Sequence, residues 1–167
     1  MASLACAFFL ASGAWAAGGK SVPITPVTPP KALPAFQYKE GDAAISLDPG
    51  KYALTILHVW ATWCVPCVAE LPQVDKISEK YSPRGVYVIA LSLDTDSRKV
   101  QEFYADKQIL HLGVALDSMN KGFSISGIQG LPGTLFINKN GEIVARTDGP
   151  VDWQSKDVTD FIESQLQ

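Results

Sequence analysis

Two cysteines separated by two residues stand where a predicted strand gives way to a predicted helix. Cys64 and Cys67 follow the apolar run at residues 53–60, and a helical pattern begins at the first of them. The free N–H groups and the positive dipole end of a helix favour the thiolate form of a cysteine placed there. We therefore expect Cys64 to attack a disulfide of another molecule. Cys67, one turn deeper, would then resolve the mixed disulfide by forming a Cys64–Cys67 bond.

A structural disulfide and a metal site are the alternatives for this pair. A bridge that closes so short a loop constrains the unfolded chain little, which argues against a structural role. A zinc site would need a second ligand pair, and neither His58 nor His111 has zinc-finger spacing. We expect a redox-active pair with no resident metal and, in the absence of nicotinamide or flavin motifs, no cofactor. Cu(I) handling by the same two thiolates remains the alternative function.

Two ionisable residues lie close to the cysteines in the sequence. Glu70 follows Cys67 by three residues, so both share a helix face, and the carboxyl could exchange a proton with Cys67 during resolution. The alternative is an exposed Glu in the first helical turn. His58 lies in the apolar strand, six residues before Cys64, where it could move a proton or tune the acidity of the cysteines. The alternative, a hydrogen-bonded core histidine, stays open.

Composition and charge indicate one globular domain. The chain has 167 residues, 47% of them hydrophobic, and a formal charge of −3. No block of basic residues occurs, so a nucleic-acid partner has no electrostatic support. We expect a monomer that acts on other proteins.

The first residues resemble an export signal. Residues 1–16 lack charged side chains, and their apolar run is shorter than the roughly 20 residues that a membrane span requires. The run ends in the pattern Ala14-Trp15-Ala16, typical of signal cleavage, which would remove Cys6. An uncleaved anchor is the alternative, because the start carries no positive charge. Residues 17–35 are rich in proline, and we expect them to form an extended linker outside the folded domain.

Hydrophobic periodicity predicts an α/β domain over residues 36–167, with a central mixed sheet and helices on both faces. An N-terminal edge hairpin and a central insertion complete this prediction. The order is β-α-β followed by β-β-α. The predicted strands are 36–39, 44–47, 53–60, 86–93, 112–116, 134–137 and 142–147, and the predicted helices are 64–80, 97–107, 118–126 and 154–166.

Several segments resemble one known family. Residues 60–67, W-A-T-W-C-V-P-C, resemble the active site of thioredoxin-like proteins. Residues 70–72 (E-L-P) and 130–137 (G-L-P-G-T-L-F-I) are similar to segments of the TlpA/ResA/DsbE (CcmG) branch. The resemblance covers residues 36–167. It implies a thioredoxin-like fold and a periplasmic or extracytoplasmic thiol-disulfide oxidoreductase, often anchored to the membrane.

The resemblance also implies residues that bind the substrate. It implies a cis Leu131–Pro132 bond beside the cysteines, with the backbone before the proline pairing with an extended client segment. The alternative is a proline that merely begins a strand. We expect Trp63 to form an exposed rim that contacts the client, and Trp153 to serve packing only. At the position of His58, thioredoxins carry a buried Asp and this branch often has Asn.

The residues between the cysteines predict the direction of electron flow. Val65 and Pro66 offer neither a charge nor a side-chain donor, whereas strong oxidants often carry a His there that stabilises the thiolate. We therefore predict a reductase of client-protein disulfides that receives electrons from a membrane thiol reductant. By resemblance, the client would be apocytochrome c or a copper-site protein, in cytochrome c maturation or cytochrome oxidase assembly.

Overall fold

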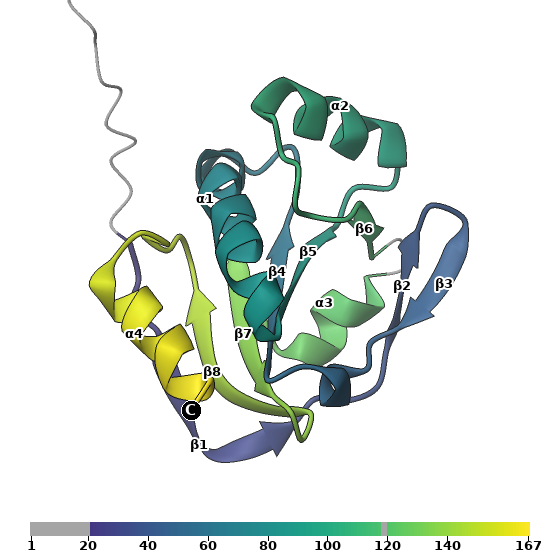
Figure 1. The fold of residues 1–167 in the computed structure, drawn as a ribbon. Helices are drawn as coiled ribbons and strands as arrows, with labels where there is room; N and C mark the ends of the chain where they lie inside the picture. Colours follow the sequence, from purple (N-terminus) through teal and green to yellow (C-terminus); the bar gives the residue numbers. More distant parts are fainter. Residues whose placement is uncertain (1–20, 118–119) are drawn as a thin grey trace, which may run out of the picture.

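The computed structural model describes residues 21–117 and 120–167, and it has helices packed on both faces of a mixed sheet (Figure 1). Within these residues the sheet has eight strands in the order β1-β8-β7-β4-β5-β6-β2-β3. The strands are β1 (Thr25–Ala32), β2 (Gln37–Glu40), β3 (Ala43–Ser46), β4 (Leu54–Trp60), β5 (Val86–Ser92), β6 (Ala115–Leu116), β7 (Gly133–Asn138) and β8 (Glu142–Asp148). The helices are α1 (Val65–Tyr81), α2 (Ser97–Lys107), α3 (Lys121–Ser126) and α4 (Lys156–Gln165), with 3-10 turns at Pro49–Lys51 and Ser82–Arg84.

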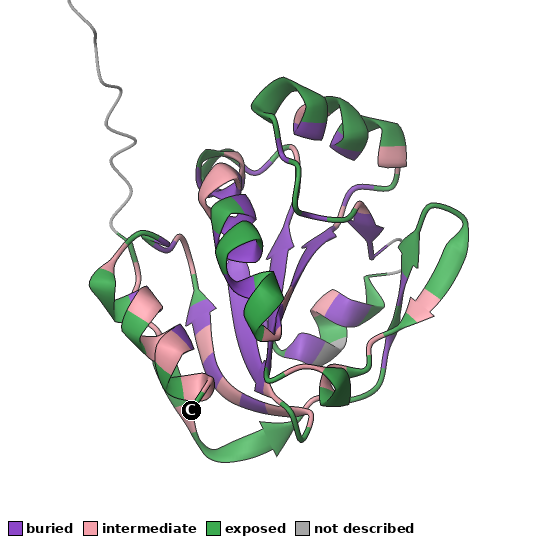
Figure 2. Cartoon of the chain, in the orientation of Figure 1, coloured by how far each residue is buried: buried purple, intermediate pink, exposed green. Residues whose placement is uncertain are grey.

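Strand β4 is the centre of the sheet. All seven of its residues are buried, and it runs parallel to β5 and antiparallel to β7. Its apolar run therefore fits a strand that is covered on both faces, as the sequence predicts. Figure 2 shows that the central strands are buried, whereas the edge strand β1 is largely exposed.

The two faces of the sheet carry separate hydrophobic cores. Because side chains alternate along a strand, one core takes Ile56 and Trp60 of β4, and the other takes Leu57 and Val59. Helices α1, α2 and α4 cover the first core, while α3 contributes to the second through Phe123. The predicted arrangement, a mixed sheet with helices on both faces, is confirmed.

The proline-rich stretch corrects the expected boundary of the folded domain. Residues 25–32 do not form a spacer without core contacts, because they make strand β1, which pairs antiparallel with β8. Val22 and Ile24 pack against one hydrophobic core, and Val27 and Leu33 pack against the other. The prolines are tolerated because an edge strand needs N–H donors on one side only.

The remaining predicted strands and helices differ from the observed ones mainly in length. Strands β2 and β3 form the expected edge hairpin. The strand predicted at 112–116 is limited to β6, and the helix predicted at 118–126 begins at Lys121. The predicted signal peptide at 1–16 and residues 118–119 lie outside the described residues.

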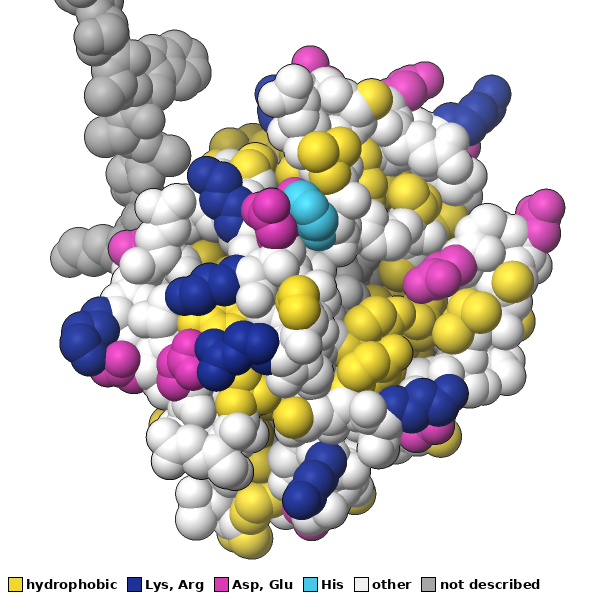
Figure 3. Space-filling view, in the orientation of Figure 1, with side chains coloured by type: hydrophobic (Ala, Val, Ile, Leu, Met, Phe, Trp, Pro, Cys, Tyr) yellow, Lys and Arg dark blue, Asp and Glu magenta, His cyan; other side chains and the backbone are white. Residues whose placement is uncertain are grey.

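Charged side chains of both signs are mixed on the face drawn in Figure 3, where Lys and Arg alternate with Asp and Glu. Across residues 21–117 and 120–167, none of the helices has the length and apolar character that crossing a membrane requires.

Candidate active site

The two cysteines form a disulfide at the start of helix α1. Cys64 is the N-cap residue of the helix, and Cys67 lies in its first turn. Their Cα atoms are 5.2 Å apart, a normal separation for a disulfide. Cys64 is 7% exposed, whereas Cys67 is fully buried. Cys64 is therefore the more exposed of the two cysteines and the one that another molecule can reach more easily.

Exposed apolar side chains flank the disulfide. Trp63 is 67% exposed and Val65 is 77% exposed, which is unusual for large hydrophobic residues. The Leu131–Pro132 bond is cis, and Pro132 comes directly before the start of β7. Gly133 pairs with Val59 near the end of β4, so the proline lies at the sheet end from which the cysteine loop departs.

The loop between β4 and α1 is held by one buried carboxylate. Asp94, just after β5, accepts hydrogen bonds from the Thr62 backbone N–H at 2.8 Å and from Thr62 Oγ1 at 2.7 Å. It also accepts one from Ser92 Oγ at 2.7 Å. These bonds fix the residue two positions before Cys64 and so set the position of the reactive sulfur.

Glu70 is buried on helix α1, one turn after Cys67, with only 4% of its surface exposed. The alternative of an exposed, first-turn Glu is therefore wrong. Its Oε2 accepts a hydrogen bond from the Val151 backbone N–H at 2.7 Å. Burial raises the pKa of Glu70 to about 7, while the N–H groups of Val151 and Trp153 act in the opposite direction. This carboxyl can therefore gain or lose a proton near neutral pH.

His58 faces Glu70 from the central strand. It is fully buried, with Nδ1 3.0 Å from Thr134 Oγ1 in a hydrogen bond and Nε2 3.4 Å from Glu70 Oε1. Burial lowers the pKa of His58 to about 3, so the imidazole is neutral at physiological pH. His58 is thus a hydrogen-bonded core histidine, as one alternative expects, and its role in moving a proton or tuning the acidity of the cysteines stays a prediction.

Three contributors to this site escape sequence reasoning. Thr134 lies on β7, and Val151 and Trp153 lie in the segment before α4, about 80 residues from Glu70 along the chain. The sequence predicts a packing role for Trp153, and its ring packs edge-on against His58 with centroids 5.7 Å apart. Its indole N–H also acts to lower the pKa of Glu70, although the two groups do not form a well-aligned hydrogen bond. Val151 acts through its backbone, which no sequence motif marks.

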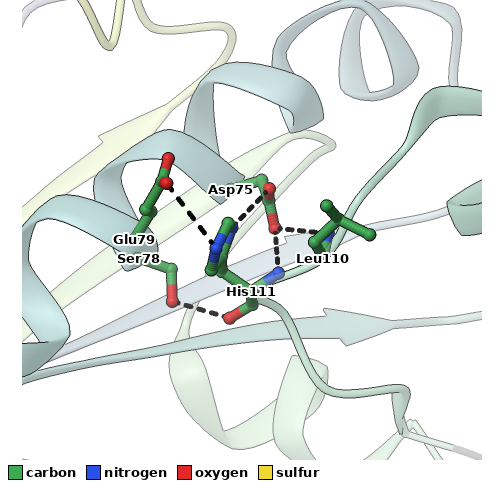
Figure 4. Close-up of polar contacts among 5 residues, drawn as sticks. All are labelled: Asp75, Ser78, Glu79, Leu110 and His111. Atoms are coloured by element: carbon green, nitrogen blue, oxygen red, sulfur yellow. Dashed lines mark hydrogen bonds and ion pairs between the residues drawn. The ribbon is translucent and has the colours of Figure 1, made fainter.

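The second histidine, His111, belongs to a separate cluster with Asp75, Ser78 and Glu79, shown in Figure 4. Its backbone N–H donates to Asp75 Oδ1 at 2.7 Å, and its Nδ1 lies 3.1 Å from Asp75 Oδ2. Ser78 Oγ donates to the His111 carbonyl at 2.8 Å, and Glu79 lies 3.7 Å from Nε2. These contacts tie the loop after α2 to helix α1. In the described part of the chain, no group of three or more His, Cys, Asp or Glu side chains is arranged to hold a metal ion.

The chain is similar to known redox proteins. The family model described as Redoxin matches residues 29–162. Over 117 residues the chain is 33% identical to the thiol-disulfide oxidoreductase ResA of Oceanobacillus iheyensis, a match covering 67% of this chain and 60% of that relative. The chain thus aligns with less than two thirds of that relative's length.

Solved structures share the fold. The structure is similar to that of the thiol:disulfide interchange protein DsbE from Chlorobium tepidum, with a TM-score of 0.73 and 24% identity over 83% of this chain and 97% of the other. StoA from Bacillus subtilis gives a TM-score of 0.64 and 25% identity over 83% and 100% of the two chains. These similarities support the thioredoxin-like α/β fold.

Proposed function

Because the chain belongs to the Redoxin family, we propose that it is a thiol-disulfide oxidoreductase whose Cys64–Cys67 pair exchanges electrons with client proteins. One observation carries the proposal: a disulfide stands at a helix N-terminus, and a buried carboxyl with a pKa of about 7 lies one turn farther along the same helix. A structural disulfide would not need this titrating group.

The reaction starts from the reduced pair. The Cys64 thiolate attacks one sulfur of a client disulfide, the other client sulfur leaves as a thiolate, and a mixed disulfide forms. Cys67 then gives its proton to the Glu70 carboxylate and attacks the Cys64 sulfur. The second client sulfur leaves with the electron pair. The client gains two electrons, and the protein ends as the Cys64–Cys67 disulfide with a protonated Glu70.

The client is held by the exposed rim of the site. Trp63 offers a large apolar surface beside Cys64, and the backbone of Leu131, ahead of Pro132, pairs with an extended client segment. The client presents a disulfide in an accessible and unfolded stretch. Apocytochrome c and copper-site proteins are the client classes that fit this role.

The protein works as a reductase outside the cytoplasm. Residues 1–16 serve as an export signal or anchor, and Val65 and Pro66 leave the thiolate without an added stabilising group. A membrane dithiol restores the reduced state by attacking Cys64. Equilibration with glutathione buffers tests the direction, and a potential as high as those of strong oxidants would refute it.

Trapping of the mixed disulfide tests the function itself. Cys67→Ser leaves the attacking sulfur but removes the resolving one, so a client should accumulate on Cys64 as a complex that dithiothreitol releases. Mass spectrometry of the released protein identifies the client. Cys64→Ser is the matched control and should trap nothing. Equal recovery from both variants would refute the proposal.

A further inference from the structure

Three buried polar atoms meet at Glu70 without well-aligned partners. Glu70 Oε1, His58 Nε2 and Trp153 Nε1 make no hydrogen bond in the described part of the structure. The first two lie 3.4 Å apart, and the rings of His58 and Trp153 are in edge-on contact. An unpaired buried polar atom costs about 1–3 kcal/mol. One unpaired carboxyl oxygen with two unpaired ring nitrogens beside it indicates groups that pair alternately rather than all at once.

The two side chains offer opposite chemistry to Glu70. When the Nδ1 of a neutral imidazole donates to Thr134, its Nε2 can only accept, so it can bond only to a protonated carboxyl. An indole N–H can only donate, and it bonds more strongly to the charged carboxylate than to the neutral acid. The Val151 N–H holds the other carboxyl oxygen.

We propose that His58 and Trp153 are opposing positioning residues for Glu70, the imidazole Nε2 holding the protonated carboxyl and the indole N–H holding the carboxylate. This inference rests on the proposed function, because the proton that changes hands is the one exchanged with Cys67. It assigns His58 the tautomer protonated at Nδ1, and it assigns Trp153 a role beyond packing.

Glu70 changes its hydrogen-bond partner as the Cys64–Cys67 disulfide opens and closes. When an external thiolate attacks the Cys64 sulfur, Cys67 leaves with the electron pair and takes the proton of Glu70. The resulting carboxylate is then held by Trp153. When Cys67 later attacks Cys64, its proton returns to Glu70, which donates to His58 Nε2. One proton moves between Cys67 and Glu70 in each direction.

The groups packed around Glu70 support this assignment. His58 on β4 lies 3.4 Å from Glu70 Oε1, and Cys67 precedes Glu70 by one turn on the same helix. Strand β7 presents Thr134 behind His58, and the segment before α4 presents Val151 and Trp153. Asp152 of that segment is exposed and accepts instead from the Gln154 N–H at 3.1 Å.

Titration of Glu70 in the oxidised, full-length protein tests the proposal. The side-chain carboxyl is followed by NMR with ¹³C-labelled glutamate, and Glu70→Gln identifies its signal. His58→Asn keeps a group at the Nδ1 position but none at Nε2, and it should lower the pKa of Glu70. Trp153→Phe keeps the ring without the N–H and should raise it. Each shift should be about 0.5–1 pH unit, the size expected from one lost hydrogen bond.

Matched variants separate this role from a general loss of structure. His58→Gln restores an acceptor near the Nε2 position and should return the pKa of Glu70 toward that of the wild type. Thr134→Val frees the imidazole to adopt the other tautomer and should lower it, which keeps the test available if His58→Asn does not fold. His111→Asn removes the histidine of the separate cluster and should change nothing.

Shifts in the same direction, or no shift in His58→Asn and Trp153→Phe, would overturn the proposal. The titration needs no turnover, so its outcome is independent of whether a client is reduced. If the wild type failed to form mixed disulfides while the opposite shifts were observed, the proposed function would fall and the assignment of partners to Glu70 would stand.

Discussion

Glu70 combines two properties that explain its value at a redox centre. It is almost fully buried, and the same burial brings its pKa to about 7. Proton transfer is most efficient when the pKa of the acid or base lies near the working pH. Because Glu70 and Cys67 share one face of α1, the proton released by the buried thiol has an acceptor one helical turn away.

Glu70→Gln should slow the resolving step. The variant keeps the shape of the side chain but cannot accept the proton of Cys67, so the decay of the mixed disulfide should slow roughly 100-fold. The dependence of that rate on pH around 7 should also disappear. Quenched-flow measurement of the mixed disulfide with a model client gives both quantities.

Glu79→Gln is the matched control on the same helix. Glu79 lies beside His111, in the separate cluster, so its replacement should leave resolution unchanged. A Glu70→Gln variant that resolves as fast as the control would show that water, rather than this carboxyl, takes the proton.

Sequence reasoning reaches part of this centre. The spacing of Cys64 and Cys67 and the i, i+3 relation of Glu70 are local, so they can be predicted from helix geometry. The partners of Glu70 are not local. Val151 and Trp153 reach it only because α4 packs beside α1 over the same core, a relation that depends on the whole topology.

At the level of elements, the loop before α1 depends on its neighbour. Strands β4 and β5 are parallel and end side by side, so Asp94 after β5 meets Thr62 after β4. The carboxylate satisfies the Thr62 backbone N–H and two hydroxyl groups together. The position of Cys64 is thus set by contacts between strand ends rather than by α1 alone.

Asp94→Ala should loosen this loop. The substitution leaves the Thr62 and Ser92 groups without their acceptor, and the expected loss in free energy of unfolding is about 2–4 kcal/mol. The rate of the first attack by Cys64 should fall as well. Urea denaturation and single-turnover kinetics measure the two effects.

Asp96→Ala provides the comparison, because Asp96 caps α2 through the Arg98 N–H at 3.0 Å and otherwise pairs with the exposed guanidinium of Arg98, away from the cysteine loop. Its loss should cost about 1 kcal/mol and leave the attack rate unchanged. If both variants lost the same stability and kept the wild-type rate, Asp94 would have no special role in the loop.

The elements themselves were predicted unevenly. Strands β4 and β5 are long apolar runs between turn signals, so their type and position follow from the sequence. Strand β1 was missed because three of its eight residues are prolines, which normally argue against a strand. The pairing of β1 with β8 shows that β1 is an edge strand, where prolines can lie without breaking hydrogen bonds to a second neighbour.

For the whole molecule, the two buried ionisable groups act on stability in opposite senses. The pKa of Glu70 is raised from 4.5 to about 7, so its contribution to stability is lost as pH rises through that range. The pKa of His58 is lowered from 6.5 to about 3, so its contribution is lost as pH falls through that range. Between about pH 4.5 and 6.5 the effect of Glu70 lowers the free energy of unfolding as pH rises and the effect of His58 raises it, so the two pH dependences offset each other.

Single variants should reveal the pH dependence of stability that each group causes. Relative to the wild type, Glu70→Gln should gain roughly 2–3 kcal/mol of stability between pH 4.5 and 6.5, because only the His58 slope remains. His58→Asn should lose a similar amount over the same range, because only the Glu70 slope remains. Urea unfolding at several pH values measures this. Three parallel curves would mean that neither group has a shifted pKa.

The proline-rich strand at the edge of the sheet bears on the proposed action on unfolded clients. An open strand edge invites pairing with any extended chain and so promotes aggregation. Pro26, Pro29 and Pro30 cannot donate hydrogen bonds, and Lys31 adds a charge, so β1 covers β8 while offering a poor template of its own. The stretch that resembles a linker therefore limits where client chains can add to the sheet.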